Sequence, residues 1–140
     1  MTGALELFAH EIVNITGGNF EGTAVMIIWS SAFASAFVDN IPYTATMIPI
    51  IENISEDPTI AKSLERFDYN PLWYALAIGA DFGGNGTLIG ASANLVAISI
   101  VERHGYRMAF RDFLIKGMPY MIGTVAIGTA IFLVKMMLNV

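Results

Sequence analysis

Two acidic residues lie inside long apolar stretches of this chain, and each has an asparagine close by. Asp39 and Asn40 interrupt the apolar residues 22–51, and Asp81 lies in a glycine-rich interruption of residues 72–100. A carboxylate at mid-bilayer costs several kcal/mol, so within a membrane segment it usually marks an ion or proton pathway. Backbone that is broken at that depth persists only where it lines an enclosed cavity. The pattern therefore predicts a site for an ion or a small polar solute.

The first interruption, residues 38–42, has two interpretations. As a functional group, Asp39 would be a cation ligand or a proton carrier; as a structural group, it would cap the helix that follows it. Asn40 adds an amide that binds either charge sign, and Pro42 opens the first turn of a helix whose positive end lies near Thr44. A helix N-terminus attracts anions and a C-terminus attracts cations, so the sign of the bound species stays open.

The second interruption, residues 79–90, carries the other half of the candidate site. We expect its glycines to expose backbone carbonyls and amides to a ligand. These glycines are Gly79, Gly83, Gly84 and Gly86. The Lys-Ser/Thr ending of a phosphate-binding loop is missing. The candidate binding residues in and after this interruption are Asp81, Asn85, Gly86, Thr87, Ser92 and Asn94. Asn94 is equally well explained as a hydrogen-bonding amide between packed helices.

Composition indicates a membrane protein without a metal centre. Apolar residues make up 55% of the 140 and charged residues 14%, whereas soluble domains carry nearer a quarter charged. The net charge of −5 disfavours a nucleic-acid partner. The absence of cysteine excludes disulfides and thiolate ligands, and we expect no cofactor beyond a coupling ion, Na⁺ or H⁺.

Apolar periodicity predicts an all-α integral membrane fold, residues 1–140 forming a single membrane-embedded unit. We expect an amphipathic interfacial helix, a re-entrant helical hairpin, a polar outside loop, one broken transmembrane helix, a cytoplasmic loop and one continuous C-terminal transmembrane helix. In that order these elements cover residues 1–21, 22–51, 52–70, 71–101, 102–117 and 118–139. The alternative to the hairpin is one kinked crossing over residues 24–51.

We expect a multi-pass protein of the cell (plasma) membrane. The placement of charged residues predicts its orientation. Residues 102–116 contain three arginines and a lysine, and short basic loops stay cytoplasmic. Residues 52–70 and the C-terminus then lie outside. A hairpin puts residues 1–21 outside as well, which their lack of Lys and Arg favours over a kinked crossing.

Two longer motifs, SAFVDNIPYTATMIP at residues 35–49 and GADFGGNGTLIGASAN at residues 79–94, resemble the ArsB/NhaD-type permeases of the ion transporter superfamily. This branch has P protein and citrate transporter-like members. The resemblance implies an inverted-repeat carrier with the hairpin tip at residues 39–42 and an unwound stretch at residues 81–90. Dicarboxylate carriers of the superfamily have Ser-Asn-Thr at the tip. Asp39 in place of that serine disfavours a dicarboxylate and favours cation or proton coupling.

Members of this branch are much longer, so the resemblance covers their C-terminal third only. It implies a fragment or split product whose missing N-terminal repeat would supply the other wall of the site. The expected partners are the lipid bilayer, the transported ion or small anion, and that missing repeat. A homodimer with a second copy is a further option. The predicted function is secondary transport of an inorganic ion or small anion by a permease such as an antiporter, and not catalysis.

Two alternatives stay open. The chain could be a non-transporting fragment or assembly subunit that needs a separate first half. Asp39 and Asp81 could also form the acid pair of an intramembrane aspartyl protease, but such pairs need facing, largely continuous helices.

Overall fold

The computed structural model describes residues 2–138, with the side chains of residues 2 and 4–6 excepted, and within this range the chain is entirely helical. The helices are α1 (Thr2–Ile15), α2 (Phe20–Ser35), α3 (Asn40–Glu56), α4 (Pro58–Leu64), α5 (Pro71–Gly83), α6 (Ser92–Arg103) and α7 (Phe110–Leu138). The predicted all-α class is confirmed. Residue 1 and residue 139 of the predicted last helix lie outside the described residues.

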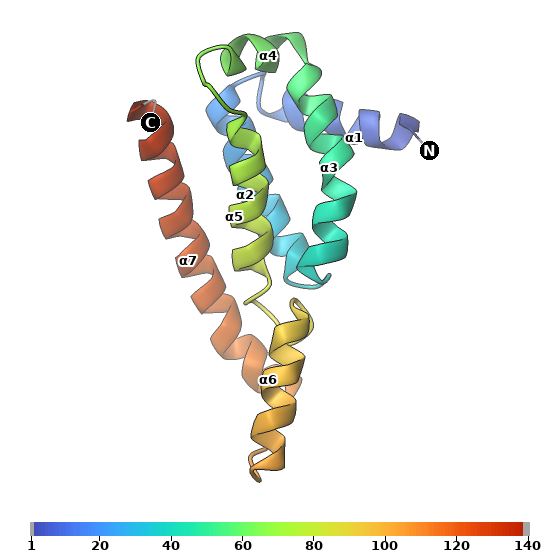
Figure 1. The fold of residues 1–140 in the computed structure, drawn as a ribbon, viewed down its shortest axis with the longest axis vertical. Coiled ribbons are helices and arrows are strands. Elements are labelled where there is room, and N and C mark those ends of the chain that lie inside the picture. The colour runs from blue at the N-terminus through green and yellow to red at the C-terminus, as the bar shows by residue number, and fades with distance from the viewer. Residues whose placement is uncertain (1, 139–140) are drawn as a thin grey trace.

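The first apolar stretch forms a helical hairpin. The chain reverses at residues 36–39, so that α2 and α3 lie on the same side of this tip (Figure 1). One kinked helix over residues 24–51, our alternative, is therefore not what forms. α2 has 16 residues and α3 has 17, which corresponds to about 25 Å each. Neither helix reaches the roughly 20 residues that a crossing needs.

The predicted loop at residues 52–70 is partly helical, which corrects the sequence interpretation. α3 continues to Glu56, and α4 follows after a single residue, Asp57. Asp57 caps α4, with Pro58 at the first helical position, where its missing N–H is no loss. The polar residues that suggested a loop therefore lie partly in the end of α3 and in α4, and only residues 65–70 form a longer non-helical connection.

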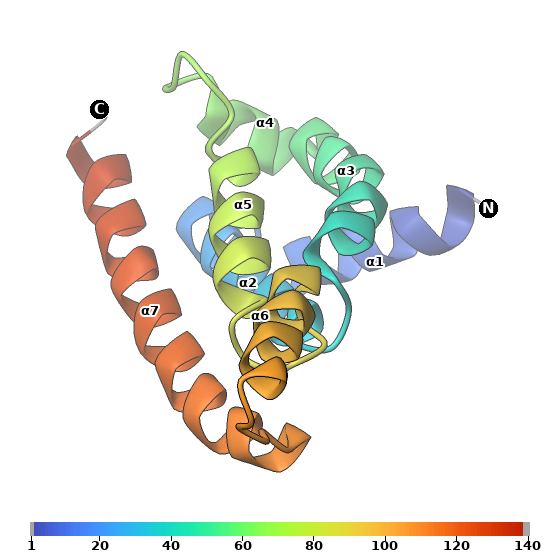
Figure 2. The same cartoon turned by 60° about the horizontal axis from the view of Figure 1, so that its bottom comes forward.

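The second apolar stretch forms two helices with an unwound segment, residues 84–91, between them. α5 continues through Gly83, so Asp81 belongs to its last turn. We had expected Asp81 to begin the unwound segment, and the structure corrects this. α6 has no buried residue. It extends beyond the hairpin tip and the end of α5 in Figure 1 and points toward the viewer in Figure 2.

The last helix begins at Phe110 instead of residue 118, so only residues 104–109 of the predicted loop 102–117 lack helical structure. Asp112 accepts a hydrogen bond from the Ala109 amide at 3.3 Å and so stabilises this earlier start. Within residues 2–138, α7 is the one helix that is long and apolar enough to cross a membrane.

The interface between α2 and α5 forms the centre of the core. Ile27 and Ile28 of α2 and Leu72 and Leu76 of α5 are buried there. The backbones approach closely because Gly83 faces α2: a Cβ on Gly83 would lie 2.4 Å from the carbonyl oxygen of Ala32. This tight pair positions the ends of α2 and α5 beside each other.

Candidate functional site

The hairpin tip and the unwound segment lie in contact. The hydroxyl of Thr87, which is fully buried, donates a hydrogen bond to the carbonyl of Ala36 at the tip. The buried Ser35 hydroxyl donates to the Ala80 carbonyl at 2.6 Å. A Cβ on Gly90 would lie 2.8 Å from the same Ala36 oxygen. The two interruptions, far apart in the sequence, therefore form one place in the fold.

Asp39 caps two helices. One carboxylate oxygen accepts the Ile41 amide of its own helix, α3, at 3.2 Å. The other accepts the Ser92 amide at 3.0 Å and the Ser92 hydroxyl. Ser92 is the first residue of α6, and the residue before it, Ala91, makes no side-chain capping bond. Two positive helix ends thus converge on one carboxylate, which occupies the position where a bound anion would be stabilised.

Asp81 lies beside this carboxylate but has a different partner. The side-chain amide of Asn40 donates to Asp81 Oδ1 at 3.3 Å. Among the hydrogen bonds of the described residues none joins Asp39 to Asp81, a contact that the acid pair of an aspartyl protease would make. Asp81 is exposed, and this leaves its other oxygen accessible to a ligand.

Thr87 and Asn94 have structural roles in this conformation. The Asn94 amide donates to the carbonyls of Gly84 and Thr87, each at 2.9 Å, and so closes the unwound segment on itself. These bonds stay within the interruption and do not join two packed helices, so the choice between ligand contact and helix packing for Asn94 stays a prediction. Thr87 is buried and bonded to Ala36, so neither donor faces an open space.

The remaining candidates lie around these residues. Pro42 and Thr44 are in the first turns of α3, where Pro42 is exposed and Thr44 half-buried. Asn85 is exposed. Gly86 lies against α7, where a Cβ would meet the Met118 sulfur at 3.1 Å. The structure thus groups Asp39, Asn40, Asp81 and Ser92 by hydrogen bonds, with the others at their edges.

The glycines near the interruption allow close approach of helices, and our expectation that they expose backbone to a ligand stays a prediction. The described glycines with positive φ are Gly17, Gly18 and Gly105, none of which is in the unwound segment. A Cβ on Gly79 would lie 2.4 Å from the Ile28 carbonyl oxygen of α2. The glycines near the break therefore bring three helices together around it.

Sequence reasoning missed two serines on α2, Ser31 and Ser35. Both are fully buried and four residues apart, and they face the Gly79–Gly83 side of α5. The Tyr43 hydroxyl donates to or accepts from Ser31 at 3.1 Å, which joins α2 to α3. Small residues at this spacing on two apolar helices are a known packing signal and could have been noticed.

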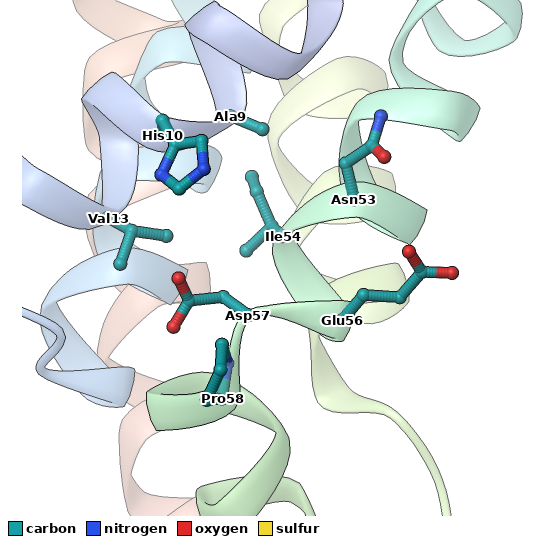
Figure 3. A pocket seen from close by; sticks show the side chains of 8 residues that line it. All are labelled: Ala9, His10, Val13, Asn53, Ile54, Glu56, Asp57 and Pro58. Carbon is teal, nitrogen blue, oxygen red and sulfur yellow. The ribbon is translucent and has the colours of Figure 1, made fainter.

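An open pocket of about 380 Å³ lies elsewhere, between α1 and the corner of α3 and α4. Figure 3 shows His10, Asn53 and Asp57 around it. The Asp57 carboxylate is engaged by the Thr59 amide at 2.9 Å, and the described residues hold no cluster suited to a metal ion. The pocket offers no chemistry comparable to the tip.

Comparison with known proteins identifies a family and several relatives of the chain. A family model described as a citrate transporter matches residues 1–140. The chain is 50% identical to the P protein of Mus musculus over 115 residues, 82% of this chain and 13% of that protein. It is 42% identical to an uncharacterized transporter of Mycobacterium bovis over 116 residues, 83% of this chain and 26% of that protein.

A 46 kDa membrane protein of Mycobacterium leprae is 36% identical over 126 residues, 90% of this chain and 28% of that protein. The chain thus spans little more than a quarter, or less, of the length of these relatives. No solved structure matches the chain.

Proposed function

The chain belongs to the citrate transporter family, and we propose that it forms the C-terminal part of a secondary transporter that moves an inorganic ion or a small anion. The coupling ion would be H⁺ or Na⁺, and the carrier would be a multi-pass protein of the plasma membrane. In this proposal, α2 and α3 are a re-entrant hairpin, α5 and α6 a broken membrane helix and α7 a full crossing.

The observation that carries the proposal is the convergence on Asp39 of two helix N-termini, those of α3 and α6. Half-helix ends that meet at a broken backbone are the recurrent form of ion and anion sites in transporters. Asp81 and Asn40, joined at 3.3 Å, add a carboxylate and an amide to the same place. No other part of the described chain brings such groups together.

The dimensions support a site at membrane depth. α7 has 29 residues and is about 44 Å long, whereas each hairpin helix is about 25 Å long. The tip therefore reaches only part of the way along α7, and Figure 1 shows it near the middle of the long axis. Polar backbone at this depth requires a protein-enclosed, solute-accessible environment.

The chemistry of Asp39 supports ion coupling. When ionised, its carboxylate supplies the negative charge that both helix ends attract. When protonated, or when a cation neutralises it, that attraction weakens, and the N-terminus of α6 becomes available to a small anion. Binding of a proton would thus favour binding of an anion, and by reciprocity the anion would favour binding of the proton, which is the linkage that coupled transport of the two needs.

The test is Asp39→Asn in the full-length transporter, reconstituted in vesicles, with gradient-driven uptake measured against pH. Asparagine keeps the size and the acceptor oxygen but removes the titrating charge. We expect loss of the pH dependence together with a large fall in coupled transport. Asp68→Asn, a change at an exposed acid of the α4–α5 connection, is the matched control and should leave transport unchanged. An unaltered pH profile in Asp39→Asn would refute the assignment.

A second candidate is an assembly subunit that carries no solute by itself. It is favoured by the open surface of α6, none of whose residues is buried. In either case the expected partner is the first repeat of the same transporter, whether it lies on the same polypeptide or on a separate one. Uptake by this chain reconstituted alone would exclude the subunit role.

A further inference from the structure

A groove lies between α5 and α7 near the C-terminal end of α7. Its volume is about 100 Å³, and Lys135 and Ile131 of α7 face Tyr74 and Ile78 of α5 across it, with Tyr69 at the upper rim. Ile131 is 65% exposed and Tyr74 53% exposed, so the groove opens onto the surroundings of the helix pair.

The charged and phenolic side chains of the groove lie at its outer end, the end nearer the C-terminus of α7. α5 and α7 run in opposite directions (Figure 1). One turn along α5 leads from Tyr74 to Ile78, and one turn back along α7 leads from Lys135 to Ile131. Lys135, Tyr74 and Tyr69 therefore line the outer end, together with the buried Met136, and the inner end is lined by Ile78, Ile131 and the buried Phe132.

The inner end is closed where the two helices touch. A Cβ on Gly128 would lie 2.9 Å from a ring carbon of Phe82 and 3.1 Å from a methyl carbon of Ile78. The α7 side of the groove runs from Met136 to Ile131, about 8 Å along the helix axis. The groove is thus a short slot with a cationic outer end and an apolar blind end.

The charge of Lys135 is not compensated by an acid within the described residues, whose one ion pair joins Arg66 and Glu21 at 2.6 Å. The Lys135 nitrogen lies 5.8 Å from the ring centre of Tyr69 and 5.7 Å from that of Tyr74. Ring faces attract and orient an ammonium, but they carry no net charge. The ammonium is held in place and remains available to an anion.

We propose that this groove binds an anionic phospholipid, with its phosphate on Lys135 and the first part of an acyl chain over Ile131 and Ile78. An amphiphile fits a groove with a charged outer end and an apolar inner end, whereas free phosphate would leave the apolar end unused. Basic pockets between membrane helices bind lipid headgroups at the cytoplasmic side of membranes. In the orientation predicted above Lys135 lies at the outer side, so the lipid would belong to the outer leaflet. The proposal rests on the membrane embedding of α7 in the proposed function, but not on Asp39 or on transport.

The test places the full chain in nanodiscs of phosphatidylcholine with a minor share of phosphatidylglycerol and counts retained lipids by native mass spectrometry. We expect phosphatidylglycerol to be retained several-fold over its share in the bilayer. Lys135→Gln should abolish this enrichment, and Lys135→Arg should keep it. Lys62→Gln, which removes an exposed charge on α4, is the control and should also keep it.

Ile131→Ser separates a lipid from free phosphate, since it removes apolar floor at an exposed position and keeps the charge. A reduced enrichment supports the lipid. Unchanged enrichment, or full displacement of phosphatidylglycerol by inorganic phosphate, overturns it. Equal retention in the wild type and Lys135→Gln overturns it as well, even in a protein that transports normally. Enrichment in an embedded protein that transports nothing supports the lipid site and counts only against the transport function.

Discussion

The two halves of the broken helix differ in how the rest of the chain covers them. α5 buries one face along its whole length, from Leu72 to Gly83, whereas α6 has no buried residue. Both halves adjoin the same unwound segment and the same hairpin tip. One side of the candidate site is therefore fixed by this chain, and the other side is attached only at its start.

The cause lies in the residues that each half presents. α5 offers Gly79 and Gly83, which admit the α2 backbone to distances that any Cβ would prevent. α6 presents Leu95, Val96 and Ile100, which are about half exposed. Its tie to the hairpin is the Asp39 carboxylate at Ser92. An apolar helix left open in this way fits the proposal that another repeat covers it.

The largest expected difference comes from removing a leucine from each half. Leu76 of α5 is 2% exposed and Leu95 of α6 is 49% exposed. Leu76→Ala should lower the free energy of unfolding by about 2–5 kcal/mol, because it leaves a cavity in the core. Leu95→Ala should change it by less than about 0.5 kcal/mol. Denaturant unfolding of the chain in detergent measures both.

Equal losses at the two positions would show that α6 is packed as firmly as α5. The same substitution can be made in the longer protein. If Leu95→Ala lowers the free energy of unfolding there but not in this chain, another part of the longer protein covers α6.

The sequence predicted the two interruptions because their signals are local. Pro42 disfavours continuation of the helix that precedes it, and four glycines within eight residues weaken a helix. The reversal at the tip followed from segment length, since neither apolar half could cross a bilayer. The helical class could be predicted for the same reason, because the periodicity of apolar residues is a local signal that extends over a few turns.

The contacts across the site could not be predicted, because they join residues about 40 to 53 positions apart. Nothing local indicates that Asp39 caps α6, or that Thr87 bonds the Ala36 carbonyl. The predicted helix boundaries were wrong where a single residue determines them. Asp57 is an example, because it caps a helix that begins inside the expected loop.

A smaller effect is expected from the contact that holds the unwound segment. Thr87→Val keeps the shape but leaves the Ala36 carbonyl without its hydroxyl partner. The free energy of unfolding should fall by about 1–3 kcal/mol, with faster amide hydrogen exchange at residues 84–91. Thr124→Val is the control, because that hydroxyl bonds the Tyr120 carbonyl of its own helix at 3.0 Å. Unchanged exchange in Thr87→Val would mean that the glycine contacts alone hold the segment.

The smallest effect concerns how helices begin. α4 has its own cap, whereas α6 depends on the distant Asp39. The hydrogen bond from the Thr59 hydroxyl, helped by the Thr59 amide at 2.9 Å, holds the pKa of the Asp57 carboxyl below its usual value. The ionised form is thus favoured by folding. Its contribution is complete above the ordinary carboxyl pKa of about 3.9 and is lost as the pH falls through the lowered value.

Asp57→Ala should therefore cost about 1 kcal/mol at neutral pH, the usual worth of an exposed cap. Asp57→Asn keeps an acceptor oxygen without a charge, so it should lose less at neutral pH and remove this acid-dependent loss. Unfolding in detergent at neutral pH and below pH 4 measures the difference, with Asp68→Asn as the control. If Asp57→Asn weakens in acid as much as the wild type does, the charge of this cap is not what stabilises α4. In that case the charge of Asp57 would not distinguish α4, which has a local cap, from α6, which is capped by the distant Asp39. The two helices would then differ only in how far they are buried.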